Sequence, residues 1–293
     1  MTFLDVVQSP LAQRSFLIAL IVGAIAPIIG TFLVQRRLAL LGDGIGHVAL
    51  TGVGMGWLVG SFTGATQADA YAIPGAIIAA VIGAIIIEYM RRDGATSGDV
   101  ALALLFYGGI AGGVLIIALA GGTSANLTGY LFGSLATVST TDVVLTVVLA
   151  AIIIIVGMWF QKALFAVNYD EEFALASGLP TTALNILTAV TAALTVTLAM
   201  RVVGLLLVSA LMIVPVASAQ TFTRSFRSTM KVAIALGMIT STAGLVVTFF
   251  YPVPPGATIV VLAILIYIVL AGVHSRTQRV KVTTRPSSSH REI

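Results

Sequence analysis

The sequence predicts an all-α protein that crosses a membrane about eight or nine times. Of its 293 residues, 58% are hydrophobic and only 9% are charged, whereas a soluble domain carries about 25% charged residues. Water cannot solvate so apolar a surface, so lipid must surround it. The net charge of +4 does not indicate nucleic-acid binding, because most basic residues lie in short loops between apolar segments. The chain has no cysteine, which excludes disulfides and thiolate metal sites.

Nine apolar segments are each close to the ~20 residues that a helix needs to cross the hydrocarbon core. They cover residues 15–35, 43–61, 71–90, 99–120, 142–160, 182–200, 202–220, 231–250 and 257–273. The second segment is short and rich in glycine. Its pairs Gly42 with Gly46 and Gly52 with Gly56 have the small-xxx-small spacing that lets helices approach closely. We therefore expect one transmembrane domain over residues 1–275, without the internal repeat typical of secondary transporters.

Lysine and arginine test this arrangement. With the N-terminus outside and nine crossings, thirteen of the 15 basic residues lie inside, and only Arg14 and Arg201 lie outside. Such a bias is typical of the cytoplasmic side of membrane proteins. Residues 276–293 are then expected to be a disordered, basic cytoplasmic tail. The uncharged stretch 121–141 lies outside, where we expect a re-entrant or interfacial segment.

The loop after the fifth span, "NYDEEFALASGLP" at residues 168–180, predicts a short helix on the cytoplasmic side. Asp170 can cap it, and Glu171 and Glu172 favour its first turn, while Gly178 can end it. Such an acidic helix suits docking to another protein, and an ordinary interfacial helix is the alternative. No lysine follows the glycine of a GxxxxGK[ST] phosphate-binding loop, so any ATP would be bound by another chain.

Asp43 and His47 lie four residues apart within the second apolar segment. At this spacing both side chains project from one helical face and can contact one cation. A carboxylate with a neutral imidazole suits Zn²⁺, Mn²⁺ or Fe²⁺. Two ligands leave a site incomplete, which is typical of transport because the ion must also leave. The alternative is structural: Asp43 caps its helix or pairs with Arg36 or Arg37, and His47 bonds to a neighbouring backbone group.

Other charged residues receive structural interpretations. Glu88 lies three and four residues before Arg91 and Arg92, a spacing that favours an ion pair at the surface. Ser97 and Asp99 stand at the start of the fourth span and Thr140, Thr141 and Asp142 at the start of the fifth, where they are expected to cap helices.

The stretch "RRLALLGDGIGHVALTGVGMG" at residues 36–56 resembles the signature of the permease subunits of ATP-binding-cassette importers for zinc, manganese and related metals. Further stretches similar to this family are "GDVALALLFYGGIAGG" (98–113), "LTGYLFGSLATVSTTDV" (127–143), "VGLLLVSALMIVPVASA" (203–219) and the 168–180 loop. The resemblance covers most of residues 10–275 in consistent order. Two departures are Gly46, where the family has serine, and Thr51, where it has proline.

The resemblance implies a type II ABC importer-like permease in the cell membrane. It further implies a homodimer with the pathway between its subunits, two cytoplasmic ATPase subunits and an extracytoplasmic metal-binding protein. Such a permease is no enzyme and holds no permanent cofactor; its cargo is a divalent metal. The matching metal residues are Asp43 and His47. The matching ATPase-coupling residues, in the loop at about 168–178, are Asp170, Glu171, Glu172, Phe173, Ala174 and Gly178.

The residues alone leave two other functions open. A permease for a metal chelate or a cobalamin-like ligand would use the same ATP-driven engine, but its wider pathway would need no pair of aspartate and histidine. An ion-gradient-driven carrier or a channel would work without ATP, and the acidic docking loop argues against it. The ligand types do not decide between zinc, manganese and iron.

Overall fold

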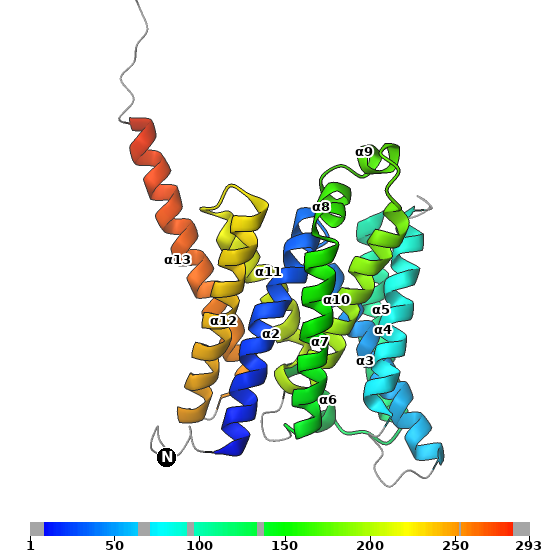
Figure 1. Ribbon diagram of the computed structural model, residues 1–293. Helices are drawn as coiled ribbons and strands as arrows, with labels where there is room; N and C mark the ends of the chain where they lie inside the picture. Colours follow the sequence, from blue (N-terminus) through cyan, green and yellow to red (C-terminus); the bar gives the residue numbers. More distant parts are fainter. Residues whose placement is uncertain (1–8, 64–70, 93–96, 134–137, 252, 284–293) are drawn as a thin grey trace, which may run out of the picture.

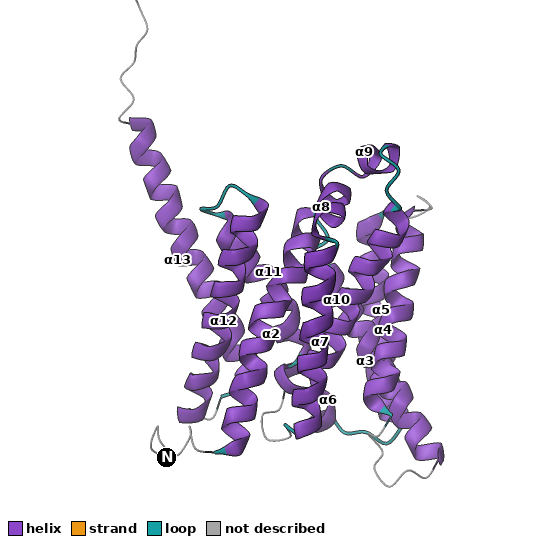
Figure 2. Cartoon of the chain, in the orientation of Figure 1, coloured by secondary structure: helices purple, strands orange, loops and turns teal. Residues whose placement is uncertain are grey.

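A computed structural model describes residues 9–63, 71–92, 97–133, 138–251 and 253–283. Every regular element in these residues is a helix (Figure 2). The helices, in chain order, are α2 (Pro10–Gln35), α3 (Leu41–Thr63), α4 (Ala72–Arg92), α5 (Gly98–Leu119), α6 (Ser124–Phe132), α7 (Thr140–Trp159), α8 (Gln161–Tyr169), α9 (Glu171–Ala176), α10 (Thr181–Val203), α11 (Leu205–Gln220), α12 (Phe226–Phe250) and α13 (Pro255–Thr283). The predicted all-α membrane fold is confirmed.

The nine predicted apolar segments correspond to the nine long helices of the described chain. Seven of these helices are long and apolar enough to cross a membrane, and α10 and α11 are two further apolar helices. Helix α2 begins at the end of the bundle opposite α9, whereas α13 ends on the side of α9 (Figure 1). This arrangement agrees with an odd number of crossings. The stretch 121–141 contains the short helix α6, and residues 134–137 of it lie outside the described residues.

Helix α13 is longer than predicted. It continues to Thr283, past the expected start of a disordered tail at residue 276. Arginine, glutamine and lysine are good helix formers, and residues 276–283 contain neither glycine nor proline. The rest of the predicted tail, residues 284–293, lies outside the described residues.

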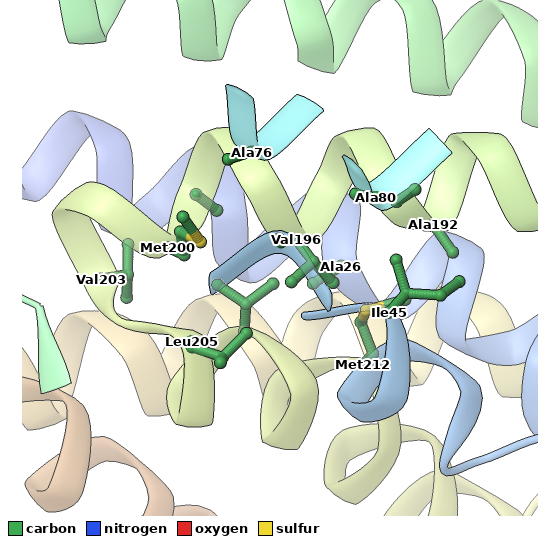
Figure 3. Packing of buried hydrophobic residues seen from close by; sticks show 14 of the residues in the cluster. Ala26, Ile45, Ala76, Ala80, Ala192, Val196, Met200, Val203, Leu205 and Met212 are labelled. Atoms are coloured by element: carbon green, nitrogen blue, oxygen red, sulfur yellow. The ribbon is translucent and has the colours of Figure 1, made fainter. Parts of the chain in front are cut away.

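Small residues let the helices approach closely. A Cβ at Gly52 would meet the backbone of Gly75 on α4, and one at Gly56 would meet the backbone of Tyr71 just before it. The predicted close approach at this glycine pair is therefore confirmed. Apolar side chains from α3, α10 and α11 fill the centre (Figure 3), among them Ile45, Val196 and Leu205, all fully buried.

Serines cap both α5 and α7, and one of them, Ser97, is a predicted cap. Ser97 accepts a hydrogen bond from the backbone N–H of Val100 at 3.4 Å, and Asp99 lies within the first turn. Ser139 caps α7 through a capping box, in which the Asp142 carboxylate accepts from the Ser139 backbone N–H at 2.8 Å. The short hydroxyl reaches the N–H three residues on, while the acidic residue returns to the cap. The prediction is therefore confirmed for Ser97 and wrong for Asp99, and Asp142 takes part in the capping box while Ser139, which was not predicted, is the N-cap.

Candidate metal site and docking helix

Asp43 and His47 lie on one face of α3, near the end of the bundle that carries α9. Asp43 is in the first turn of α3, where the helix dipole favours a carboxylate, and His47 follows one turn later. The Nε2 atom of His47 is 3.7 Å from Oδ1 of Asp43, and the two side chains are 4% and 21% exposed. The expectation that both can contact one cation agrees with this geometry.

The separation of 3.7 Å is too long for a hydrogen bond. It suits two ligands of one ion, because nitrogen and oxygen ligands at ~2.0–2.2 Å from a divalent metal can be at most about 4.3 Å apart. The other ring nitrogen of His47, Nδ1, is buried and has no hydrogen-bond partner. Buried polar atoms in proteins are normally hydrogen-bonded. Nδ1 therefore lacks the hydrogen bond that a histidine in a structural network would make.

Packing against α5 holds the His47 ring. Phe106 meets the imidazole edge to face, with ring centroids 4.5 Å apart. Gly109 approaches so closely that a Cβ on it would lie 2.5 Å from the carbonyl carbon of His47. One turn further along α3, the Thr51 hydroxyl donates to the carbonyl oxygen of Gly109 at 2.8 Å. Sequence reasoning missed Phe106 and Gly109, because nothing in the spacing of α5 indicates which helix it faces.

The two departures from the family pattern now have structural counterparts. A Cβ at Gly46 would collide with the Leu205 side chain of α11, so α3 and α11 pack closely where the family carries serine. Thr51, where the family carries proline, joins α3 to α5 through its hydrogen bond. Both positions contribute to the packing of α3 against its neighbours. Neither is one of the two predicted metal ligands, Asp43 and His47.

A cavity of about 330 Å³ adjoins Asp43, and it opens at the surface of the chain between α3 and α5. Its lining includes Asp99, Phe106 and Tyr107, together with Leu40 at the start of α3. Leu40 and Tyr107 are 64% and 70% exposed. Within the described residues, no group of three or more histidine, cysteine or acidic side chains could hold a metal. That Asp43 and His47 bind a metal stays a prediction.

The 168–180 loop contains the last two residues of α8 and the whole of the short helix α9. Asp170 caps α9 by accepting from the backbone N–H of Phe173 at 2.9 Å, and Gly178 follows the helix with a φ of 80°, which favours glycine. The predicted cap and end of this helix are confirmed. Ala174 is fully buried, whereas Phe173 and Leu175 are 66% and 64% exposed.

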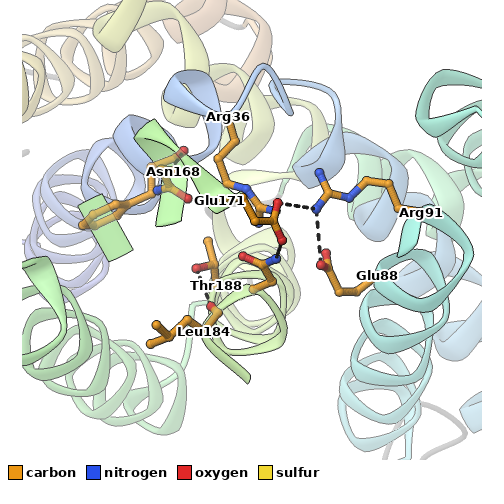
Figure 4. A network of polar contacts seen from close by, with 9 residues as sticks. Arg36, Glu88, Arg91, Asn168, Glu171, Leu184 and Thr188 are labelled. Atoms are coloured by element: carbon orange, nitrogen blue, oxygen red, sulfur yellow. Dashed lines mark hydrogen bonds and ion pairs between the residues drawn. The ribbon is translucent and has the colours of Figure 1, made fainter. Parts of the chain in front are cut away.

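The Glu171 side chain is 48% exposed, and its carboxylate lies beside Arg36 and Arg91 (Figure 4). Its Oε1 atom accepts from the Asn185 side chain of α10 at 2.7 Å. Its Oε2 atom lies 3.6 Å from Nη2 of Arg36 and 4.0 Å from Nη2 of Arg91. Arg91 in turn pairs with Glu88 at 3.2 Å. We call these five residues the α9 network; they join α9 to the ends of α2 and α4 and to α10.

The prediction that Glu88 forms a surface pair is wrong. Glu88 does pair with Arg91, but it is only 6% exposed. The last turn of α4 is covered by α10 and by the α9 network, and this packing has no trace in the local spacing. The alternative in which Asp43 pairs with Arg36 is not realised either, because Arg36 pairs with Glu171 instead.

Comparison with known proteins agrees with this geometry. The model of the ABC 3 transport family matches residues 8–273 of this chain. A manganese transport system membrane protein, MntC, of Halalkalibacterium halodurans is 31% identical over 251 residues, which cover 86% of this chain and 83% of that protein. A high-affinity zinc uptake system membrane protein, ZnuB, of Haemophilus influenzae is 26% identical over 254 residues, with 87% and 94% covered.

A solved structure, PsaBC from Streptococcus pneumoniae in complex with Fab, is similar over nearly the whole chain. It superposes with a TM-score of 0.78 at 28% sequence identity, and the match covers 92% of this chain and 95% of that chain. Together with the family match over residues 8–273, this likeness extends across all nine long helices and includes both α3 and α9. The chain therefore belongs to the ABC 3 transport family, as a membrane-spanning transport subunit.

Proposed function

We propose that this subunit forms the pathway by which an ATP-driven importer carries zinc or manganese across the cell membrane. The observation that carries the proposal is the pair Asp43 and His47, whose facing atoms are 3.7 Å apart while the buried Nδ1 of His47 has no partner. Relatives named for manganese transport and zinc uptake support the choice of cargo. Neutral imidazole with carboxylate suits both metals.

The pair binds the ion transiently during its passage. An extracytoplasmic binding protein delivers the metal to the outer mouth, and Asp43 and His47 replace part of its hydration shell. Because only two protein ligands are present, water or a second subunit completes the coordination, and the ion is released again. The subunit performs no covalent chemistry; ATP is bound and hydrolysed by separate cytoplasmic subunits.

The position of the cavity supports a homodimer. The cavity beside Asp43 opens at the surface of the chain between α3 and α5. A carboxylate facing hydrocarbon is costly, so ionisable residues within membranes face a bundle interior or a water-filled cavity. A second copy laid against this face would cover the exposed Tyr107 and enclose an aqueous pathway. It would also bring a second Asp43 and His47 to the same route, completing a site that one chain leaves half built.

The side of the bundle that carries α9 is proposed to be cytoplasmic. Arg36, Arg37, Arg91 and Arg92 all stand at this end, at the turn between α2 and α3 and in the last turn of α4. Positive residues are enriched on the cytoplasmic side. The start of α2 then lies outside, and the end of α13 lies in the cytoplasm.

Helix α9 is proposed to dock the ATPase subunit through its outward face. That face consists of Glu172, Phe173 and Leu175, all exposed. The other three residues of the predicted docking set build the helix: Asp170 caps it, Ala174 anchors it in an apolar cluster with Leu164 and Leu184, and Gly178 ends it.

Reconstituted transport tests the proposed function. The subunit, its ATPase and its binding protein are placed in liposomes, and uptake of competing radiolabelled Zn²⁺ and Mn²⁺ is measured with and without ATP. We expect ATP-dependent uptake of at least one metal. Uptake by this chain alone without ATP would establish a carrier or channel instead, and transport only of a metal chelate would establish the wider-pathway alternative.

Cross-linking tests the dimer face separately, because the chain has no native cysteine. Tyr107→Cys on α5 should form covalent dimers with a short bifunctional maleimide in membranes. The control Ile268→Cys on α13, which is 57% exposed, should not. Dimers through residue 268 and none through residue 107 would place the interface elsewhere.

A further inference from the structure

Glu171 differs from its neighbour Glu172 although both belong to the first turn of α9. Glu172 is exposed, whereas the Glu171 carboxylate is shared among Arg36, Arg91 and Asn185 (Figure 4). Glu171 is itself 48% exposed, but both of its carboxylate oxygens already contact side chains of the bundle. Its partners lie on three different helices, at the end of α2, in the last turn of α4 and in the second turn of α10.

Two of the three partners of Glu171, Arg36 and Asn185, are buried, whereas the Arg91 side chain is 25% exposed. The Arg36 side chain is 5% exposed, and its Nη2 atom, the one that faces Glu171, has no hydrogen-bond partner. Burial lowers the pKa of Arg36, and so does Arg91, whereas Glu88 and Glu171 raise it. Because Arg36 is buried, removing the carboxylate beside it would leave a buried charge without that partner, which is destabilising. A displacement of α9 must therefore carry Arg36 with it or leave that guanidinium unpaired.

Arg36 stands at the entrance to α3. It is the residue that follows α2, and only residues 37–40 separate it from the start of α3. This link is tightly turned: Arg37 has a φ of 58°, which is uncommon for a residue other than glycine. Backbone hydrogen bonds from Leu38 to Leu33 and from Leu41 to Leu38, at 2.9 and 3.0 Å, close the turn. So short and constrained a link passes a shift of Arg36 to the first turn of α3, which carries Asp43.

We propose that Glu171 is a positioning residue that ties α9 to the start of α3, so that movement of the docking helix reaches the Asp43 and His47 pair. The proposal rests on the proposed function of both regions. It assigns the two acidic residues of α9 to different tasks: Glu172 belongs to the docking face, and Glu171 connects that helix to the metal pair. Contacts of 3.6 and 4.0 Å to the two arginines leave room for the network to tighten or separate as α9 moves.

The test compares Glu171→Gln with Lys162→Gln in the full complex in liposomes. The first change removes the charge of Glu171 but keeps an oxygen that can accept from Asn185, so the helix retains its hydrogen bond. The control removes an exposed charge from the neighbouring helix α8. For Glu171→Gln we expect the ATPase subunit to co-purify within twofold of the unchanged protein, while metal taken up per ATP hydrolysed falls about tenfold. Lys162→Gln should leave both quantities unchanged.

Two transport results would overturn the proposal. Uptake per ATP equal to that of Lys162→Gln would show that the charge of Glu171 transmits nothing. Loss of the ATPase subunit from Glu171→Gln would show that Glu171 is itself a docking contact. If the unchanged complex takes up no metal, the proposed function fails, and that outcome is separate from both.

Hydrogen exchange on the permease alone tests the connection without transport. Glu171→Gln should accelerate exchange at least threefold both in residues 171–178 and in residues 37–43, and Lys162→Gln in neither. Faster exchange confined to residues 171–178 would break the proposed connection to α3.

Discussion

Two groups of charged residues at the same end of the bundle differ in how completely they are paired. The Asp43 and His47 pair has a carboxylate and an imidazole that do not hydrogen-bond to each other, and the buried Nδ1 of His47 has no partner. In the α9 network, both arginines lie beside at least one carboxylate, and Glu171 also accepts a hydrogen bond from Asn185.

This difference in pairing indicates that one group is suited to bind a ligand and the other to hold helices together. Buried charges are retained where they are paired, so two arginines facing two carboxylates need nothing further to balance their charge. The His47 imidazole packs against Phe106 and Gly109 and lies 3.7 Å from one carboxylate without a hydrogen bond to it, so it can gain a partner. The first group therefore suits mechanical connection, and the second suits transient binding of a cation.

The largest effect is expected at the metal pair. His47→Ala should lower metal uptake by the reconstituted complex by more than about 100-fold, because losing a ligand costs more than the 10–100-fold that loss of a supporting residue costs. Asp99→Asn is the matched change in the same cavity; it lies outside the pair and should cost less than tenfold. Equal losses for both variants would show that the cavity, rather than the pair, selects the ion.

A large effect on stability is expected where α5 packs against His47. Gly109→Ala places a methyl group 2.5 Å from the carbonyl carbon of His47, and such overpacking costs ~1–3 kcal/mol. Thermal unfolding of the subunit in detergent should therefore shift down, with a loss of metal uptake. Gly108→Ala is the control, since a Cβ there meets nothing within 4 Å. If the two alanines behave alike, the close contact between α3 and α5 is not what holds the imidazole.

A moderate effect is expected on the outward face of α9. Phe173→Ala should weaken ATPase co-purification about tenfold, because exposed aromatic anchors often contribute more than ~1 kcal/mol to an interface. The control is Phe222→Ala, a half-exposed aromatic residue in the link between α11 and α12. Unchanged co-purification of Phe173→Ala would remove α9 from the interface and leave the network of Glu171 without a mechanical role.

The smallest effect is expected from the hydrogen bond between α3 and α5. Thr51→Val keeps the shape of the side chain and removes the donor to Gly109, and interhelical hydrogen bonds in membranes contribute on average only ~0.6 kcal/mol. The free energy of unfolding should fall by about that amount, with metal uptake reduced less than threefold. Thr63→Val, whose hydroxyl donates within its own helix and is exposed, provides the control. A loss of uptake as large as that of His47→Ala would move Thr51 into the metal site.

Local features were predicted well because they depend on neighbours in the sequence. Nine apolar segments of about the right length became nine long helices, and the cap of α9 by Asp170 followed from a side chain three residues before its donor. The glycine pair in α3 also predicted close packing, since a missing side chain opens the same space whichever helix fills it.

Features that join distant segments were not predictable from one sequence. Glu88 was expected at the surface and lies buried, because α10 and the α9 network cover its turn. Glu171 and Glu172 look alike in the sequence, and only the position of Arg36 and Asn185 separates them. The same holds for Phe106 and Gly109, whose contact with His47 depends on the rotation of α5.

The sequence by itself determined that this protein is embedded in a membrane, how many apolar helices it has and which two residues could share a cation. It could do so because hydrophobic length and helical spacing are properties of the chain alone. Only the tertiary structure decided that the Nδ1 atom of His47 is buried without a hydrogen-bond partner and that Glu171, but not Glu172, contacts Arg36 and Asn185. Burial and charge pairing arise between helices that are far apart along the chain, so their outcome depends on packing and not on spacing.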